Sequence, residues 1–391
     1  MGVTATGERA TETGSGGAVT QVEGGSGAGA ESASTVGNPI GAGSVGAVGR
    51  ELVHGVLAVD AGNSKTDVAL VTADGQVLGT ARGGGFVPHL VGSAAAVAGL
   101  APLVAAAAAE AGFEVPAGPG ALVTHVSACL ANADLPVEEQ LLQELIAGYG
   151  WSRTTVVAND TFALLRSGTD APRGVAVVCG AGINCVGLLP DGRTARFPAL
   201  GMITGDWGGG GGLANEVMWA AARAEDGRGQ ATALAAAAAE HFGLPSVAAV
   251  AEAVHLGTIE EGRLHELVPV LFAAAEAGDP TALALIDRQA DEIVRLAVVA
   301  LRRLDLLDSA ADVVLGGGVL ASRQPLLLDG VNARLAADAP HAVPRIVTTP
   351  PVVGAALLGL DHLAAAGLGS TPGAQERLRA SYALRRAARA V

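Results

Sequence analysis

The sequence contains a single lysine. Lys65 is the only lysine among the 24 basic residues of the 391-residue chain, and all the others are arginines. Aromatic residues make up only 3% of the chain, whereas half of it is hydrophobic, much of that alanine. The core must therefore be built from valine, leucine and alanine, which suits helices packed on β-sheets. A chain of this length can bury two domain cores.

Three further scarcities limit the classes of function. The only cysteines, Cys129, Cys179 and Cys185, fit neither a disulfide framework nor a CxxC metal site, so we expect a reducing, cytoplasmic location. A formal charge of −14 gives no attraction for nucleic-acid phosphates or an anionic membrane, so neither is an expected partner. We also expect no apolar run to be long enough to span a bilayer.

The chain is predicted to consist of two domains between two tails. Residues 1–50 are rich in Gly, Ala, Ser and Thr, lack the basic and apolar regions of a secretory signal, and are expected to be disordered. Residues 51–170 and 171–365 are the expected domains. Residues 366–391 form a basic tail that is expected to be helical, with its arginines on a solvated face.

An internal repeat dominates the region between the tails. The segment VLAVDAGNSKTDVALVTADGQVLGTAR, residues 56–82, has an apolar strand, a glycine-containing loop, a second strand and an Asp-Gly turn before a third strand. The segment GVAVVCGAGINCVGLLPDGRTARF, residues 174–197, repeats this order. The duplication predicts two β-meanders that face each other across a cleft, with a glycine loop from each side.

Periodicity and breakers predict the other elements. Helices are expected at 93–111 and 136–148, and several more within 230–305 and from Pro351 onwards. Buried strands are expected at 121–130 and 154–160, and a strand within 312–320 enters a glycine turn.

Four glycine-rich turns follow strands, after Asp60, Cys179, Thr204 and Leu315. Glycine lets backbone N–H groups approach phosphate oxygens closely. None of the four is a GxxxxGK[ST] loop or a GxGxxG loop within a βαβ unit. The expected phosphate site is therefore made of hairpin turns.

The ordered motifs DxGxxKT, ND before a helix, GxGxN, GDxG and GGG resemble those of the N-acetylglucosamine kinase group. That group belongs to the BadF/BadG/BcrA/BcrD ATPase-like branch of the actin–hexokinase–Hsp70 superfamily, and the resemblance covers about residues 55–365. It implies an α/β fold of two actin-like, ribonuclease H-like domains with an ATP cleft between them. It also implies ATP and Mg²⁺ as cofactors, and phosphorylation of N-acetylglucosamine or a related amino sugar at its 6-hydroxyl. A homodimer is a candidate assembly.

The resemblance assigns roles to residues that match its motifs. The cofactor-binding set comprises a first phosphate loop, a second loop and an adenosine turn: Asp60, Gly62, Asn63, Ser64, Lys65, Thr66; Gly180, Ala181, Gly182; and Gly316, Gly317, Gly318. Asp60 would organise Mg²⁺ through water, and Lys65 would be a point charge near the β- and γ-phosphates. The sugar-binding set comprises Asn159, Asp160, Asn184, Gly205 and Asp206, with Asp160 as the catalytic base.

Some of these assignments have open alternatives. A carboxylate at a strand end can accept a proton from a hydroxyl, but the Asn159–Asp160 pair is also good helix-capping chemistry. The sequence further departs from the resemblance at Ala61, Ala181, Leu200 and Trp207, which leaves the sugar undetermined.

Two other functions stay open at this point. Some ATPases of the branch activate a partner enzyme and hold an iron–sulfur cluster through cysteines, but the three cysteines here form no ligand cluster. A sugar-sensing regulator is the third candidate, although the acidic chain shows no helix-turn-helix pattern.

Overall fold

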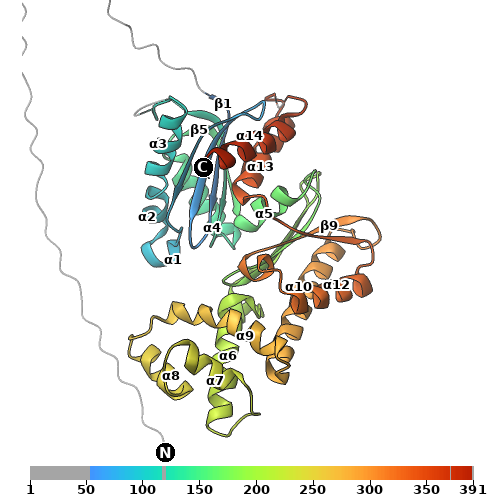
Figure 1. The fold of residues 1–391 in the computed structure, drawn as a ribbon. Coiled ribbons are helices and arrows are strands. Elements are labelled where there is room, and N and C mark those ends of the chain that lie inside the picture. The colour runs from blue at the N-terminus through green and yellow to red at the C-terminus, as the bar shows by residue number, and fades with distance from the viewer. Residues whose placement is uncertain (1–52, 117–119, 370, 390–391) are drawn as a thin grey trace, which may run out of the picture. The chain divides into compact units, whose positions relative to one another are not determined.

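The structure is a computed structural model that describes residues 53–116, 120–369 and 371–389 (Figure 1). The expected disordered tail, residues 1–50, lies outside the described residues.

The first five-stranded sheet has the order β3-β2-β1-β4-β5. The meander β1–β3 is antiparallel, and β4 and β5 run parallel to β1. The prediction of the first meander is confirmed, since the strands end where the glycine loop and the Asp-Gly turn begin. The strands are β1 (Val53–Ala61), β2 (Thr66–Thr72), β3 (Val77–Gly83), β4 (Val123–Leu130) and β5 (Ser152–Asn159).

The second sheet repeats the first strand by strand. Its order β10-β9-β6-β7-β8 is the same topology, with an antiparallel meander β6–β8 and parallel strands β9 and β10. The predicted duplication is therefore confirmed. The strands are β6 (Gly174–Cys179), β7 (Ile183–Leu188), β8 (Thr194–Arg196), β9 (Ala311–Gly316) and β10 (Ala342–Ile346).

One face of the first sheet is covered by α2 (Ser93–Ala98), α3 (Ala101–Glu110) and α4 (Pro136–Ala147), after a short α1 (Pro88–Val91). The prediction of one helix over 93–111 is wrong, because the chain breaks at Gly99 and restarts with Pro102 in the first turn of α3. Proline has no N–H to donate, so it suits a first turn, where that donor has no partner.

By length and composition, Ser93–Glu110 could cross a membrane, so the expectation that no apolar run is long enough is wrong. Two helical segments joined at a sharp bend, Glu261–Glu276 and Pro280–Arg303, are long and apolar enough only if they are counted as one span. This is weak evidence, because core helices also pass. In Ser93–Glu110 the buried residues, including Val97 and Val104, belong to the core of the first sheet.

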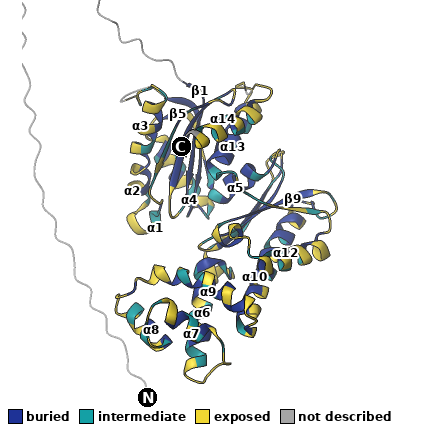
Figure 2. Ribbon diagram, viewed as in Figure 1, coloured by how far each residue is buried: buried dark blue, intermediate teal, exposed yellow. Residues whose placement is uncertain are grey.

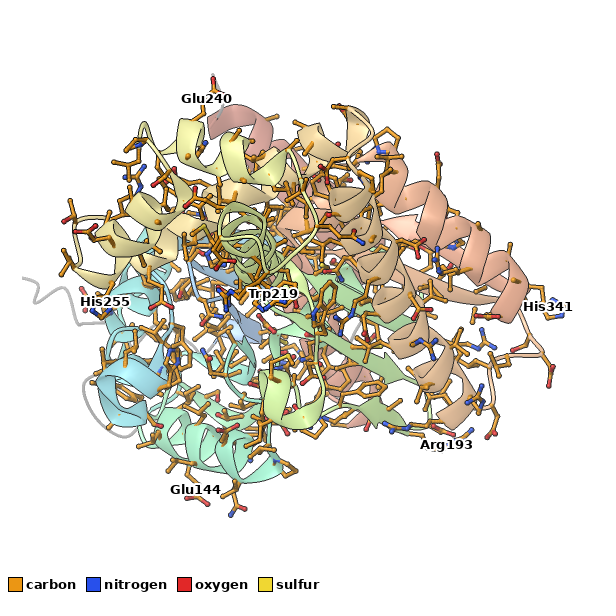
Figure 3. All side chains as sticks on the ribbon, turned by 90° about the horizontal axis from the view of Figure 1, so that it is seen from below. Glu144, Arg193, Trp219, Glu240, His255 and His341 are labelled. Carbon is orange, nitrogen blue, oxygen red and sulfur yellow. The ribbon has the colours of Figure 1, made fainter. Side chains whose placement is uncertain are left out.

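Most of the remaining helices share the largest core cluster with the second sheet (Figure 2). The opposite side of these helices is exposed, as at Trp219, which is 60% exposed under the guanidinium of Arg223 (Figure 3). These elements are η1 (Gly201–Thr204), α6 (Gly209–Glu225), α7 (Leu234–His241), α8 (Val247–His255), η2 (Glu261–Glu266), α9 (Leu267–Glu276), α10 (Pro280–Arg303), α11 (Gly318–Ala321) and α12 (Pro325–Asp338). Of these, α10, α11 and α12 contact the strands of the second sheet, while α6 to α9 pack on one another and on α10.

Two helices cross between the sheets. Helix α5 (Asp160–Gly168) follows β5 of the first sheet, yet Phe162 and Leu165 pack against the second sheet. Helix α13 (Pro351–Ala365) follows β10 of the second sheet, yet its buried side chains share a core cluster with β1 and β2. The domain boundaries at 170 and 365 stay predictions, but each of these helices packs outside the domain expected for it.

The expected C-terminal helix is present as α14 (Ala374–Arg389). It lies beside α13 in Figure 1, and its Leu378 is buried in the same cluster as α13. The expectation of a solvated arginine face is wrong in part, because Arg379 and Arg385 bond to the body of the protein.

Candidate active site

The first hairpin turn, between β1 and β2, is fixed by backbone hydrogen bonds. The N–H of Gly62 donates to the Lys65 carbonyl at 2.9 Å, and the N–H of Phe86 donates to the Gly62 carbonyl at 2.9 Å. The Lys65 side chain is exposed and makes no ion pair with any residue that the structure describes. Its ammonium is therefore available to a ligand.

Three glycines of the two hairpins leave open space where a side chain would stand. A Cβ at Gly62 or Gly180 would meet no atom closer than 3.6 or 3.9 Å, and one at Gly182 would meet nothing within 4 Å. None of the three has a positive φ. Neither packing nor backbone geometry requires glycine here, whereas a bare backbone allows an anion to approach the N–H groups.

The second hairpin, between β6 and β7, sits on the start of α6. The N–H of Gly210 donates to the Gly180 carbonyl at 2.7 Å, and the next N–H donates to the Ala181 carbonyl at 2.8 Å. Gly209 has a φ of +72°, and a Cβ there would lie 2.5 Å from the backbone of Gly182. The glycine run is thus needed for this close packing, which puts the positive end of the α6 dipole behind the hairpin.

Asn159, and not Asp160, caps α5. Its Oδ1 accepts the N–H of Thr161 at 3.0 Å, while its Nδ2 donates to Asp134 at 2.8 Å. The Nδ2 of Asn184 also donates to Asn159 Oδ1, at 3.2 Å. Asp160 is the first helical residue and does not cap the helix, although its Oδ1 accepts a long hydrogen bond, 3.5 Å, from the hydroxyl of Thr161.

Buried and half-buried carboxyl groups surround this helix start. Burial raises the pKa of Asp160 to about 6. Burial also raises the pKa of Asp134 to about 7, with Asp160 and Glu138 adding to the effect. The pKa of Asp60 lies well above its usual value, first because the side chain is buried and then because Asp160 and Asp67 are close.

A cavity of about 310 Å³ brings much of the predicted sugar site together. Asn159, Asp160 and Asn184 all line it. Both hairpins border it as well, through Asn63, Ser64, Gly180, Ala181 and Gly182. A carboxylate, several amides and the two glycine hairpins thus meet around one small polar space.

Other predicted residues lie apart from this cavity. Asp206 lines an adjoining cavity of about 410 Å³ that shares Ala181 and Gly182 with it, and Gly205 lines neither. Trp207, one of the departures from the resemblance, is a buried residue whose Nε1 donates to Glu216 at 2.9 Å. Thr66 is buried in β2.

The predicted adenosine turn stands between two cavities. Gly318 borders an apolar cavity of about 320 Å³ that also touches Gly180 and the α9 residue Phe272. Gly316 and Gly317 border a larger cavity, of about 610 Å³, together with Lys65.

Sequence reasoning missed two polar residues that follow β4. Asn132 and Asp134 line the 310 Å³ cavity, and the Asn132 Nδ2 donates to Asn63 Oδ1 at 2.8 Å. The available signal was the segment ANAD directly after a buried strand, because polar residues at the carboxyl ends of parallel strands face ligand crevices. A further missed contact is the bidentate ion pair of Arg196 with Glu139, at 2.6 and 2.8 Å.

The donors suit a magnesium ion that is bound largely through phosphate oxygens and water. No group of three or more His, Cys, Asp or Glu side chains in the described part of the chain could hold a metal ion by itself. Asp60 is 7% exposed among like-charged neighbours, so a divalent cation would relieve its buried charge. Mg²⁺ prefers few carboxylates with several waters and phosphates.

Known proteins are similar to this chain in sequence and in fold. An N-acetylmuramic acid/N-acetylglucosamine kinase of Clostridium acetobutylicum is 25% identical over 190 residues, 49% of this chain and 62% of that protein, less than two thirds of its length. An N-acetyl-D-glucosamine kinase of Dictyostelium discoideum is 25% identical over 314 residues, 78% of this chain and 97% of that protein.

A solved structure from Chromobacterium violaceum, described as a candidate N-acetylglucosamine kinase, matches with a TM-score of 0.60 and 24% identity. The match covers 78% of this chain and 98% of that one, so the two share the two-domain α/β fold predicted from the sequence. The sequence model of the BadF/BadG/BcrA/BcrD ATPase family matches residues 57–359. This chain belongs to the BadF/BadG/BcrA/BcrD ATPase family.

Proposed function

We propose that the protein is an ATP-dependent kinase that phosphorylates the 6-hydroxyl of N-acetylglucosamine or a related amino sugar. The observation that carries the proposal is the carboxylate of Asp160, which makes no ion pair with a described residue and lines a small polar cavity bordered by both hairpins. The names of the two curated relatives support the class of substrate.

Asp160 is the proposed general base. Its raised pKa of about 6 leaves it mostly ionised at neutral pH, yet more basic than an ordinary aspartate. It would accept the proton of the attacking sugar hydroxyl. The side-chain amides of Asn132, Asn159 and Asn184 line the same cavity and would orient the hydroxyl and amide groups of the sugar.

The hairpins are the proposed phosphate clamp. The backbone N–H groups around Gly62, Gly180 and Gly182 would bind phosphate oxygens, and the ammonium of Lys65 would neutralise part of their charge. Phosphoryl transfer depends on this kind of positioning and charge neutralisation more than on covalent chemistry. Mg²⁺ held near Asp60 would supply further charge neutralisation when bound.

The apolar cavity beside Gly318 is the proposed adenine site. Val268, Pro269 and Phe272 of α9 line it on one side, and Val319 of α11 lines it on the other. It also borders Gly180, so a base in this cavity would lead its phosphates towards the second hairpin.

A coupled assay of ADP release tests the proposal. The wild-type protein with Mg²⁺-ATP is mixed with N-acetylglucosamine, glucosamine, N-acetylmuramate or glucose, and the Asp160→Asn variant is the control. We expect release that depends on an amino sugar and disappears in the variant. ADP release that no sugar accelerates would refute the kinase proposal.

The rival activity is that of an ATPase that activates a partner enzyme. A cluster shared between subunits needs accessible thiolates, but Cys129, Cys179 and Cys185 are all buried, with burial raising the pKa of each. Their burial favours the sugar kinase. A cytoplasmic location and a homodimer stay predictions.

A further inference from the structure

Helix α14 borders the 610 Å³ cavity beside the first hairpin. The cavity is lined from three parts of the chain: Lys65 and Arg82 of the first meander, Gly317 and Thr348 of the second half, and Tyr382 and Arg386 of α14. Residues 57–359 match the family model, so α14 lies beyond the matched range. The helix thus adds side chains to a cavity that also contains predicted nucleotide-binding residues.

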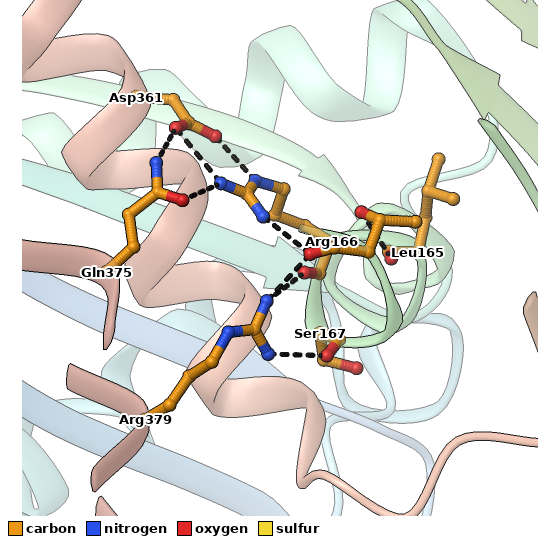
Figure 4. Close-up of polar contacts among 7 residues, drawn as sticks. Leu165, Arg166, Ser167, Asp361, Gln375 and Arg379 are labelled. Carbon is orange, nitrogen blue, oxygen red and sulfur yellow. Dashed lines mark hydrogen bonds and ion pairs between the residues drawn. The ribbon is translucent and has the colours of Figure 1, made fainter. Parts of the chain in front are cut away.

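A buried network fixes α14 in place (Figure 4). The side chain of Arg166 on α5 is fully buried and pairs with Asp361 of α13 at 2.7 Å. Gln375 of α14 accepts from Arg166 at 2.8 Å and donates to Asp361 at 3.0 Å. Arg379 donates to the carbonyls of Ser167 and Thr169, at 2.8 and 2.7 Å, near the end of α5. These contacts tie α14 to α5, which begins at Asp160.

Two further contacts fix the later turns of α14 on β3. The Oγ of Ser381 accepts the N–H of Val77 at 3.1 Å. Arg385 donates to the Leu78 carbonyl at 2.6 Å and pairs with Glu110 at 2.8 Å. Arg386, the next residue, therefore belongs to a helix that is fixed by contacts with α5 and with β3.

The cations of the cavity differ in whether they are neutralised. Arg82 donates to both oxygens of Asp67, at 2.7 and 3.0 Å, and Arg385 is paired with Glu110. Lys65 and Arg386 are exposed, and neither makes an ion pair or side-chain hydrogen bond with a residue that the structure describes. Two unpaired cations, one from the first hairpin and one from α14, thus border the same space.

We propose that α14 forms a wall of the nucleotide cleft and that its Arg386 binds the phosphate chain of ATP. The inference rests on the proposed function, because it takes the triphosphate of the kinase reaction as the anion. A triphosphate carries several negative charges, and Arg386 provides a second unpaired cation besides Lys65. A guanidinium is suited to phosphate oxygens because its N–H groups form a planar fork.

The test is the affinity for ATP, ADP and adenosine, measured by calorimetry on the full-length protein without sugar. We expect Arg386→Ala to weaken ATP binding about tenfold, as for the loss of one charge-assisted contact, and to leave adenosine binding unchanged. Arg386→Lys keeps the charge and should recover part of the affinity. The midpoint of thermal unfolding should be the same in all variants, because the Arg386 side chain makes no hydrogen bond or ion pair with a described residue.

The matched control is Arg153→Ala. Arg153 is an exposed arginine of β5 that lines none of the cavities described above, and it has no partner in the described part of the chain. The inference is overturned if Arg386→Ala leaves ATP affinity within twofold of the wild type, if adenosine binding falls equally, or if Arg153→Ala gives the same loss. In each case the wild type still binds ATP and the kinase proposal survives. A wild type that binds no ATP overturns both.

Discussion

Substitution of a hairpin glycine should change the affinity for ATP and the stability of the fold in different ways. At Gly182 an alanine Cβ would meet no atom within 4 Å, and φ is not positive there. Gly182→Ala should therefore fold normally. If the bare backbone exists to admit a phosphate, the added methyl group should nevertheless obstruct ATP.

The expected magnitudes follow from these contacts. Replacing a glycine whose conformation alanine can adopt typically stabilises a protein by about 0.4–1 kcal/mol, through the unfolded state. Losing one hydrogen bond to a charged phosphate costs about 1.5–3 kcal/mol, which corresponds to roughly ten- to a hundredfold in affinity. The variant should thus unfold at the same temperature or higher while it binds ATP far more weakly.

Thermal unfolding and calorimetric titration with ATP measure the two effects separately. Gly354→Ala is the matched control, because a Cβ there would lie 1.8 Å from the Ala163 carbonyl oxygen where α13 crosses α5. We expect this control to unfold at a lower temperature, in line with about 1–3 kcal/mol for overpacking. Unchanged ATP affinity in Gly182→Ala would show that no phosphate lies against this hairpin, and a clear fall in its stability would contradict the open space.

Three more substitutions test the site and its support. Asp160→Asn should lose turnover but keep ATP affinity. In the wild type, turnover should fall as the pH drops below about 6, because protonation removes the base. Turnover that stays constant below this pH would contradict the assignment. Lys65→Arg should lower the kinase activity with ATP while the fold stays intact, since a forked guanidinium is larger than an ammonium. Normal kinetics would mean that charge alone suffices. Arg166→Met leaves Asp361 without its cationic partner and should cost about 3 kcal/mol or more in denaturant unfolding. A loss below about 1 kcal/mol would show that the network is not needed.

The positions of the meander strands could be predicted from the sequence because the turns that delimit them have local sequence signals. An Asp-Gly turn fixes each meander, and β2 has the bounds predicted for it, Thr66–Thr72. The helix break at Gly99 was missed because the alanine-rich run around it favours helix on both sides. Gly99 and Pro102 were the available local signals of this break.

The arrangement of the candidate site could not be predicted from the sequence alone, for two reasons. Asn159 and Asp160 can both cap a helix, and a shift of one residue decides which carboxylate or amide is left free. The partners of α5 and α13 are also non-local, since an apolar helix face does not specify which sheet it will cover. Asp134 reaches Asn159 only once β4 and β5 are paired.

The duplicated framework also bears on the different roles that we propose for the two halves. The sheets share one strand order, so the ends of β4 and β5 correspond to those of β9 and β10. The first pair is followed by carboxylates and amides, including Asp134 and Asp160, which would repel a triphosphate but can bind a hydroxyl. The second pair is followed by the turn Gly316–Gly318 and by Thr348, which carry no negative charge. Within this turn, a Cβ would meet no atom within 4 Å only at Gly318. The two sheets share one backbone topology, so the proposed difference between an acceptor site and a glycine turn rests on the side chains at the strand ends.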